Sequence, residues 1–186
     1  RLFESVDLIA QASYDYFNRS FFVSSDRTTM IELAGDRSVG EFKINHPFQN
    51  LNLEYGVCSE VRRSHGHDTR NALNDAIIKH NLNNDDDIFE WSTFARTKYL
   101  FKQLSLSLGS RYVNNPSFGD NISTSFSGVY LLSNNQSLKL NVGQSYRTPS
   151  MFELYFDHPT VVGNNSLLPE TSLSHELAYL YGSTNL

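Results

Sequence analysis

The chain has 186 residues, enough for one domain with a core. Its formal net charge of -5 argues against a nucleic-acid-binding protein, because phosphate recognition needs a basic face. The single cysteine, Cys58, excludes an internal disulfide framework and a cluster of zinc-binding cysteines.

Alternating segments along the sequence predict β-strands. They lie near residues 7–16, 28–34, 40–45, 51–62, 88–98, 103–113, 121–132, 137–147 and 172–182. One segment, 69–80, has a helical pattern, in which Ala72, Ala76 and Ile77 form a short stripe and Thr69 is the N-cap. We therefore expect an all-β, antiparallel, up-and-down fold with one small helix inside a loop.

The predicted connections differ in length. Residues 99–102 and 133–136 form tight turns, whereas 63–87 and 149–170 are long and 114–121 is intermediate. If the strands run up and down, the longer connections all fall at one end of the sheet. Short turns at one end and long loops at the other are typical of outer-membrane β-barrels, whose strands also have about ten residues and an alternating pattern.

The strand at 137–147 alternates apolar residues such as Leu138 and Leu140 with polar ones such as Lys139 and Asn141. The same alternation recurs at 51–61, 104–112 and 122–130. This period of two predicts one apolar and one wet face for each strand. It does not distinguish an apolar face that meets lipid from one that meets a protein core.

The positions of the tyrosines favour an apolar face that contacts lipid. Tyr112 and Tyr146 lie on the apolar face at the long-loop end, and Tyr130 lies on it beside the tight turn at 133. Aromatic rings at both ends of an apolar band are typical of a bilayer interface. A large soluble barrel or sandwich remains the alternative at this point.

Residues 146–155, YRTPSMFELY, are followed by residues 163–177, GNNSLLPETSLSHEL. This pair of boxes resembles a signature of TonB-dependent outer-membrane receptors. The matching positions are Tyr146, Arg147, Thr148, Pro149, Ser150, Glu153, Leu154, Tyr155, Asn164, Leu167, Pro169, Glu170, Ser172 and Glu176. Asn165 stands where the second box usually has proline.

The resemblance implies a transmembrane β-barrel of about 22 strands, occluded by a plug domain that contacts the TonB complex. Residues 1–186 are then expected to be a portion of the C-terminal half of the barrel, without the plug. The implied location is the outer membrane of a Gram-negative bacterium, with membrane lipid, TonB and a small metal chelate as partners. The implied function is import of a scarce nutrient, such as a ferric siderophore, by capture in the extracellular loops and energised release.

Alternatives remain open for the cargo. His158, with Asp157 beside it, matches the interval in which haem-transporting members of this family carry an iron-ligating histidine. His65, His67 and Asp68, with the acidic run 85–87, are of the types that bind transition metals such as zinc. No resident cofactor is required, and haem or a metal complex would be cargo. A secreted or surface β-protein without transport activity is the alternative from another class.

Cations on the predicted polar faces suit an anionic chelate, because arginine forms forked hydrogen bonds to oxygen anions. They are Arg62, Arg111, Arg147 and Lys139, and their alternative partners are Glu54, Glu60, Glu153 and Glu170. For Arg147 we favour the structural pairing. No enzyme is expected, because adjacent Ser174, His175 and Glu176 point to opposite faces of a strand and cannot form a triad.

Overall fold

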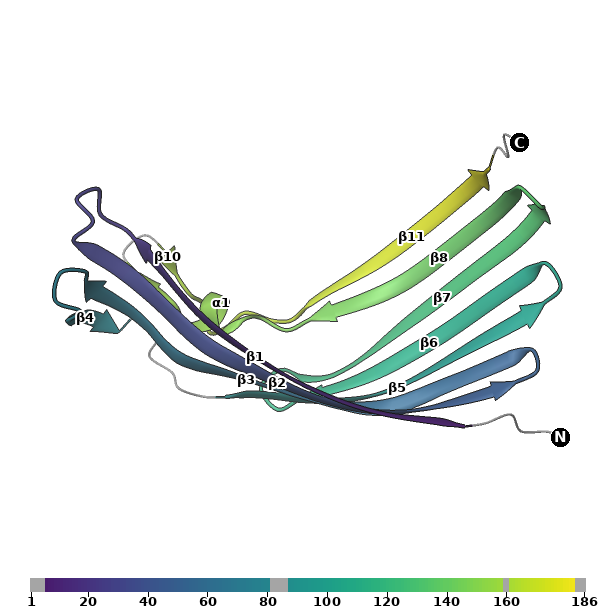
Figure 1. The fold of residues 1–186 in the computed structure, drawn as a ribbon, viewed down its shortest axis with the longest axis horizontal. Helices are drawn as coiled ribbons and strands as arrows, with labels where there is room; N and C mark the ends of the chain where they lie inside the picture. The colour runs from purple at the N-terminus through teal and green to yellow at the C-terminus, as the bar shows by residue number, and fades with distance from the viewer. Residues whose placement is uncertain (1–5, 81–86, 159–160, 183–186) are drawn as a thin grey trace.

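A computed structural model describes residues 6–80, 87–158 and 161–182. It consists of one curved nine-stranded antiparallel sheet, a two-stranded ribbon and a short helix (Figure 1). The elements are β1 (Asp7–Phe22), β2 (Thr29–Phe48), β3 (Leu51–Asn71), β4 (Ile77–His80), β5 (Ile88–Phe101), β6 (Leu104–Asn115), β7 (Gly119–Ser133), β8 (Gln136–Arg147), α1 (Met151–Tyr155), β9 (Asp157–His158), β10 (Val161–Val162) and β11 (Glu170–Tyr181).

Neighbouring strands follow the order of the chain, β1-β2-β3-β5-β6-β7-β8-β11, and β4 pairs with the end of β3. The predicted all-β, antiparallel, up-and-down fold is confirmed. The turns 49–50, 102–103 and 134–135 lie at one end, on the right of Figure 1, and the long connection 148–169 lies at the other. Among the described residues, no helix is long and apolar enough to cross a membrane.

Two predictions about local structure are wrong. Segment 69–80 is not a helix: it completes β3, turns, and returns as β4. The side-chain oxygens of Asn71 and Asn74 accept the backbone N–H groups of Leu73 and Ala76, and such local bonds favour turns over helices. The strands predicted at 28–34 and 40–45 are one continuous strand, β2.

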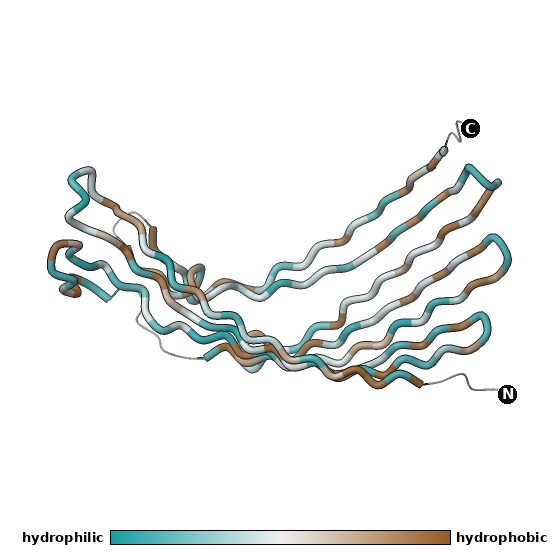
Figure 2. Tube along the Cα trace, in the orientation of Figure 1, coloured by the Kyte–Doolittle hydropathy of each residue, from teal (hydrophilic) through white to brown (hydrophobic). Residues whose placement is uncertain are grey.

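The predicted alternation of faces is confirmed near the short turns. Large apolar side chains lie exposed on one face, which we call the outer face; they include Val57, Leu108, Phe126, Leu140 and Leu177. The other, inner face carries polar residues in the same strands. Figure 2 shows this alternation of hydrophobic and hydrophilic residues along each strand. It is the pattern of a barrel wall between lipid and an aqueous lumen.

Toward the long loops the polarity of the two faces reverses. On β2, the outer face carries Phe42 and Ile44 near the short turn, but Asp36 just before the bulge between Ala34 and Gly35 and Glu32 beyond it. Ile31, on the inner face beyond the bulge, is only 2% exposed. The buried apolar residues of the structure gather at this end, namely Ile31, Ile88, Val113, Leu154 and Phe156. The core therefore lies inside the long-loop end, where the connection 148–169 packs against the wall.

Candidate functional site

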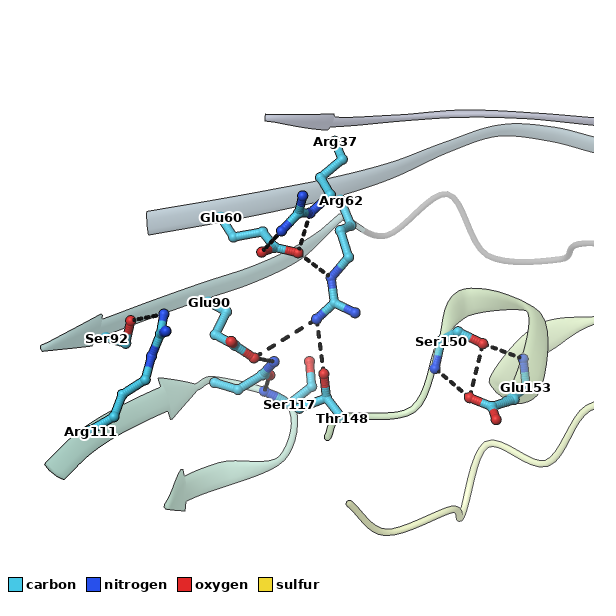
Figure 3. A network of polar contacts seen from close by, with 11 residues as sticks. Arg37, Glu60, Arg62, Glu90, Ser92, Arg111, Ser117, Thr148, Ser150 and Glu153 are labelled. Atoms are coloured by element: carbon cyan, nitrogen blue, oxygen red, sulfur yellow. Dashed lines mark hydrogen bonds and ion pairs between the residues drawn. The ribbon is translucent and has the colours of Figure 1, made fainter. Parts of the chain in front are cut away.

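A network of charged side chains crosses the inner face between strands that are distant in sequence (Figure 3). Arg37 donates to both carboxylate oxygens of Glu60, at 2.9 and 2.7 Å. Arg62 lies 3.3 Å from the same carboxylate and 3.8 Å from that of Glu90. Its guanidinium also donates to the hydroxyl of Thr148 at 2.9 Å. The network thereby ties the connection after β8 to the wall formed by β2, β3 and β5.

Arg111 occupies a different position on the same face. Its guanidinium donates to the hydroxyl of the buried Ser92 at 2.8 Å. It forms no ion pair with the described residues. Together with Glu60 and Glu90 it lines an open cavity of about 580 Å³. Of the three arginines predicted to face the lumen, Arg111 is therefore the one without an ion pair to a described carboxylate, although Glu60 attracts its charge from across the cavity.

Arg147 lies at the centre of the paired boxes and holds them together. Its guanidinium donates to both oxygens of Glu153, at 2.9 and 3.0 Å, and lies 3.1 Å from Glu170. The backbone and side chain of Ser150 also donate to Glu153, forming the capping box of α1. These bonds lower the pKa of Glu153 to about 2, and the bond from Arg147 has the largest effect. Arg147 is thus paired with carboxylates of α1 and β11, as the structural alternative predicted.

The connection 148–169 folds back onto the inner face. The rings of Phe152 and Phe156 stack with centroids 4.3 Å apart, and both lie beside the ring of His67 on β3, at 6.3 and 6.0 Å. Asn164, from the second box, donates its backbone N–H to the carbonyl of Glu153 at 2.8 Å. The two boxes therefore form one compact unit, although they are separate in the sequence.

The other residues of the two boxes differ in burial, and two of them form bonds between strands. Thr148, Pro149 and Leu154 are buried, Tyr146, Tyr155 and Pro169 are half-buried, and Leu167 is exposed. On β11, the Ser172 hydroxyl bonds to that of Ser145 at 2.8 Å, and Glu176 accepts from Asn141 at 2.7 Å. These bonds join β11 to β8 on the inner face.

The structure does not bring the predicted metal ligands of β3 together. They lie on a strand rather than in the loop 63–87 that the sequence predicted. His65 contacts Asp36, Asp68 contacts His80 at 2.8 Å, and His67 faces the aromatic rings of the inner face. Among the residues placed by the structure, no group of three or more His, Cys, Asp and Glu could hold a metal ion.

The haem ligand predicted between the boxes is only partly described. The backbone of Asp157 and His158 forms β9, which pairs with Val161 and Val162 of β10. The side chains of Asp157 and His158 lie outside the described part of the chain, as do residues 85 and 86 of the acidic run. Ligation by His158 stays a prediction.

Sequence reasoning missed a second cavity, of about 320 Å³, between the inner face and α1. Its walls include Phe17 of β1, Ser64 and His67 of β3, and Phe152 of α1. The residues escaped notice because the reversal of polarity places aromatic side chains on a face that was expected to be polar. The available signal was the group Phe17, Phe21 and Phe22, which lies where β1 continues beyond the length of a membrane strand.

Comparisons with known proteins agree with this architecture. The family model described as "TonB dependent receptor-like, beta-barrel" matches residues 3–186. The ferric enterobactin receptor PfeA of Pseudomonas aeruginosa, as a G324V mutant, superposes with a TM-score of 0.74 at 16% identity, covering 95% of this chain and 30% of that one. No curated protein sequence matches.

Two further solved structures are similar in fold. The copper transporter OprC superposes with a TM-score of 0.70 at 13% identity, covering 98% of this chain and 34% of that one. The siderophore receptor PirA of Acinetobacter baumannii gives 0.58 at 18% identity, with 96% and 30% covered. The chain thus spans about a third of the length of these proteins. Because the family model matches almost every residue of this up-and-down sheet, the chain belongs to the TonB-dependent receptor family, as part of its β-barrel.

Proposed function

We propose that the intact receptor imports a metal chelate, specifically a ferric siderophore, across the outer membrane of a Gram-negative bacterium. Two of the proteins similar in fold are a ferric enterobactin receptor and a siderophore receptor. The likeness in fold does not extend to cargo, since OprC is a copper transporter. The choice of an anionic chelate therefore depends on the inner face of this chain.

Arg111 is the observation that carries the proposal. Arg37, Arg62 and Arg147 are each committed to glutamates of the wall or of α1. The guanidinium of Arg111 lines the open cavity with one hydroxyl as its described partner. A guanidinium that is not held in an ion pair attracts oxygen anions, which it binds with charge-assisted hydrogen bonds.

The proposed transport cycle runs from the long-loop end of the sheet along its inner face. Cargo enters at the end with the long connections, contacts the arginines of the inner face, and leaves when the TonB complex acts on a plug domain. We place the plug outside residues 1–186, and we assign these residues to the C-terminal half of a barrel of about 22 strands. Outer-membrane lipid covers the outer face.

The test uses cells that produce the full-length receptor. Uptake of radioactive iron is measured with ferric enterobactin, in a strain without the receptor and in the same strain complemented with it. We expect complementation to restore uptake, and Arg111→Ala to weaken chelate binding about tenfold, as the loss of a hydrogen bond to a charged group does. Arg96→Ala is the matched control, because the Arg96 guanidinium is already 3.4 Å from a Glu54 oxygen.

Other cargoes give different outcomes. Transport of copper or zinc without any chelate would contradict the proposal. So would a haemin complex whose Soret band disappears in His158→Ala, which would establish the haem alternative. Equal effects of Arg111→Ala and Arg96→Ala would remove Arg111 from the binding surface.

A further inference from the structure

The 320 Å³ cavity between β1, β3 and α1, which we call the α1 pocket, has an apolar side and a charged side, and the charged side is formed by Asp15, Asp36, Arg37, Arg62 and Arg63. Phe17 comes from β1, and Met151 and Phe152 come from the α1 segment. His67 closes the pocket on the β3 side, with its ring against Phe152. Sites for small organic ligands combine apolar and aromatic side chains with a few convergent polar groups, and the apolar side of this pocket with His67 and Ser64 has that composition.

Two uncharged side chains at this pocket, those of His67 and Ser64, each have a buried polar atom without a hydrogen-bond partner among the described residues. His67 is only 6% exposed, and its Nδ1 has no hydrogen-bond partner among the described residues. The hydroxyl oxygen of Ser64, also on β3, is buried and has no hydrogen-bond partner among the described residues. Buried polar atoms are nearly always hydrogen-bonded in folded proteins. Their position beside one cavity indicates a group that supplies hydrogen bonds to both.

The charges around the pocket are already balanced. Arg37 is paired with Glu60 and lies 3.8 Å from Asp15. Arg63 is paired with Asp36 and Asp87. A charged group in the pocket would therefore have to displace an existing ion pair. The part of a ligand that fits is uncharged, flat and able to hydrogen-bond.

We propose that the α1 pocket binds the uncharged part of one aromatic ring and its amide group, as an aryl arm of the transported chelate whose deprotonated hydroxyl oxygens stay on the metal. The assignment to cargo rests on the proposed function. A volume of about 320 Å³ is at the lower end of the range for ligand pockets, so the pocket suits one substituted ring rather than a whole chelate or a porphyrin. Arg37 lines both this pocket and the open cavity beside Arg111. The ring would thus bind in the pocket while the metal centre stays in the open cavity.

The test measures binding of two ferric chelates to the purified full-length receptor in detergent, by titration calorimetry. Ferric enterobactin has aryl arms, whereas ferric desferrioxamine B has none. His67→Phe keeps a ring against Phe152 but removes the unpartnered nitrogen, and Ser64→Leu fills the pocket. The control is His175→Ala, because His175 is an exposed residue of β11 and does not line the pocket.

We expect His67→Phe and Ser64→Leu each to weaken binding of ferric enterobactin about tenfold, which corresponds to one lost hydrogen bond or one displaced contact. Binding of ferric desferrioxamine B and the effect of His175→Ala should stay at the wild-type level. Unchanged enterobactin affinity in both pocket variants would overturn the proposal, and so would equal losses for both chelates.

A second measurement separates this proposal from the function on which it rests. Crystals of the full-length receptor are soaked with 2,3-dihydroxybenzamide, a single substituted ring without metal. Density for the ring between Phe17 and Phe152 supports the pocket even if the receptor transports no ferric siderophore. A pocket filled by side chains of the plug, or by water alone at saturating ring concentration, overturns it.

Discussion

Gly163 is the residue whose replacement tests the packing of the paired boxes most directly. A Cβ atom at this position would lie 2.8 Å from the carbonyl carbon and oxygen of Leu154 and from the nitrogen of Phe156. All three are backbone atoms, so no side-chain rotation relieves the contact, and the chain must separate to at least 3.4 Å. Gly163→Ala is therefore expected to destabilise the folded connection 148–169 by about 1–3 kcal/mol, the usual cost of overpacking.

Hydrogen exchange of the full-length receptor measures this cost locally. The amide of Gly163 donates to the carbonyl of Phe156 at 2.6 Å, and that of Asn164 donates to Glu153 at 2.8 Å. In Gly163→Ala both amides should exchange roughly 5 to 150 times faster, the equivalent of that free energy. Gly143→Ala is the control, because its Cβ would meet the Ser174 hydroxyl at an ordinary 3.7 Å. Unchanged exchange at residues 163 and 164 would refute the reasoning.

Two further predictions concern charge. Because the pKa of Glu153 is lowered from 4.5 to about 2, its ionised form stabilises the connection at neutral pH; that stabilisation is fully present above pH 4.5 and is lost as the pH falls toward 2. Exchange at Asn164, corrected for the intrinsic effect of pH, should show this loss in the wild type and no such transition in Glu153→Gln. On β6, Leu108→Arg should destabilise the receptor in phospholipid vesicles by about 2–4 kcal/mol, since Leu108 is 57% exposed on the outer face. Ser107→Arg on the inner face should cost little, and urea titration giving equal costs would disprove the assignment of the faces.

The regular part of the fold was predictable because apolar and polar residues alternate along the strands. Residues such as Leu108 and Leu140 point outward with polar neighbours between them, and this pattern needs no knowledge of distant contacts. The paired boxes likewise located Arg147 and Glu153 before their contacts were visible. Their spacing of six residues brings the two side chains together across the N-terminus of α1.

The failures have local and long-range causes. The helical stripe at 69–80 was outweighed by the turn chemistry of Asn71 and Asn74, whose side chains bond to nearby backbone groups. Strand β2 appeared interrupted by its glycines and charges, but pairing with β1 and β3 on both sides keeps it extended. The α1 pocket could not be predicted, because Phe17 and Phe152 meet only after the wall has curved and the connection has folded back.

The reversal of polarity at the bulge near Gly35 divides the barrel wall into two parts, which differ in the face that carries the apolar side chains. On the short-turn side of the bulge, substitutions must keep the outer face apolar. On the long-loop side, they must preserve the packing of a buried core, as in a water-soluble protein. The two parts can therefore be redesigned separately, because a substitution in the buried core around Ile31 and Leu154 leaves the apolar outer face around Leu108 and Leu140 unchanged. A chimera that exchanges only the segments on the long-loop side of the bulge keeps the alternating strands near the short turns intact.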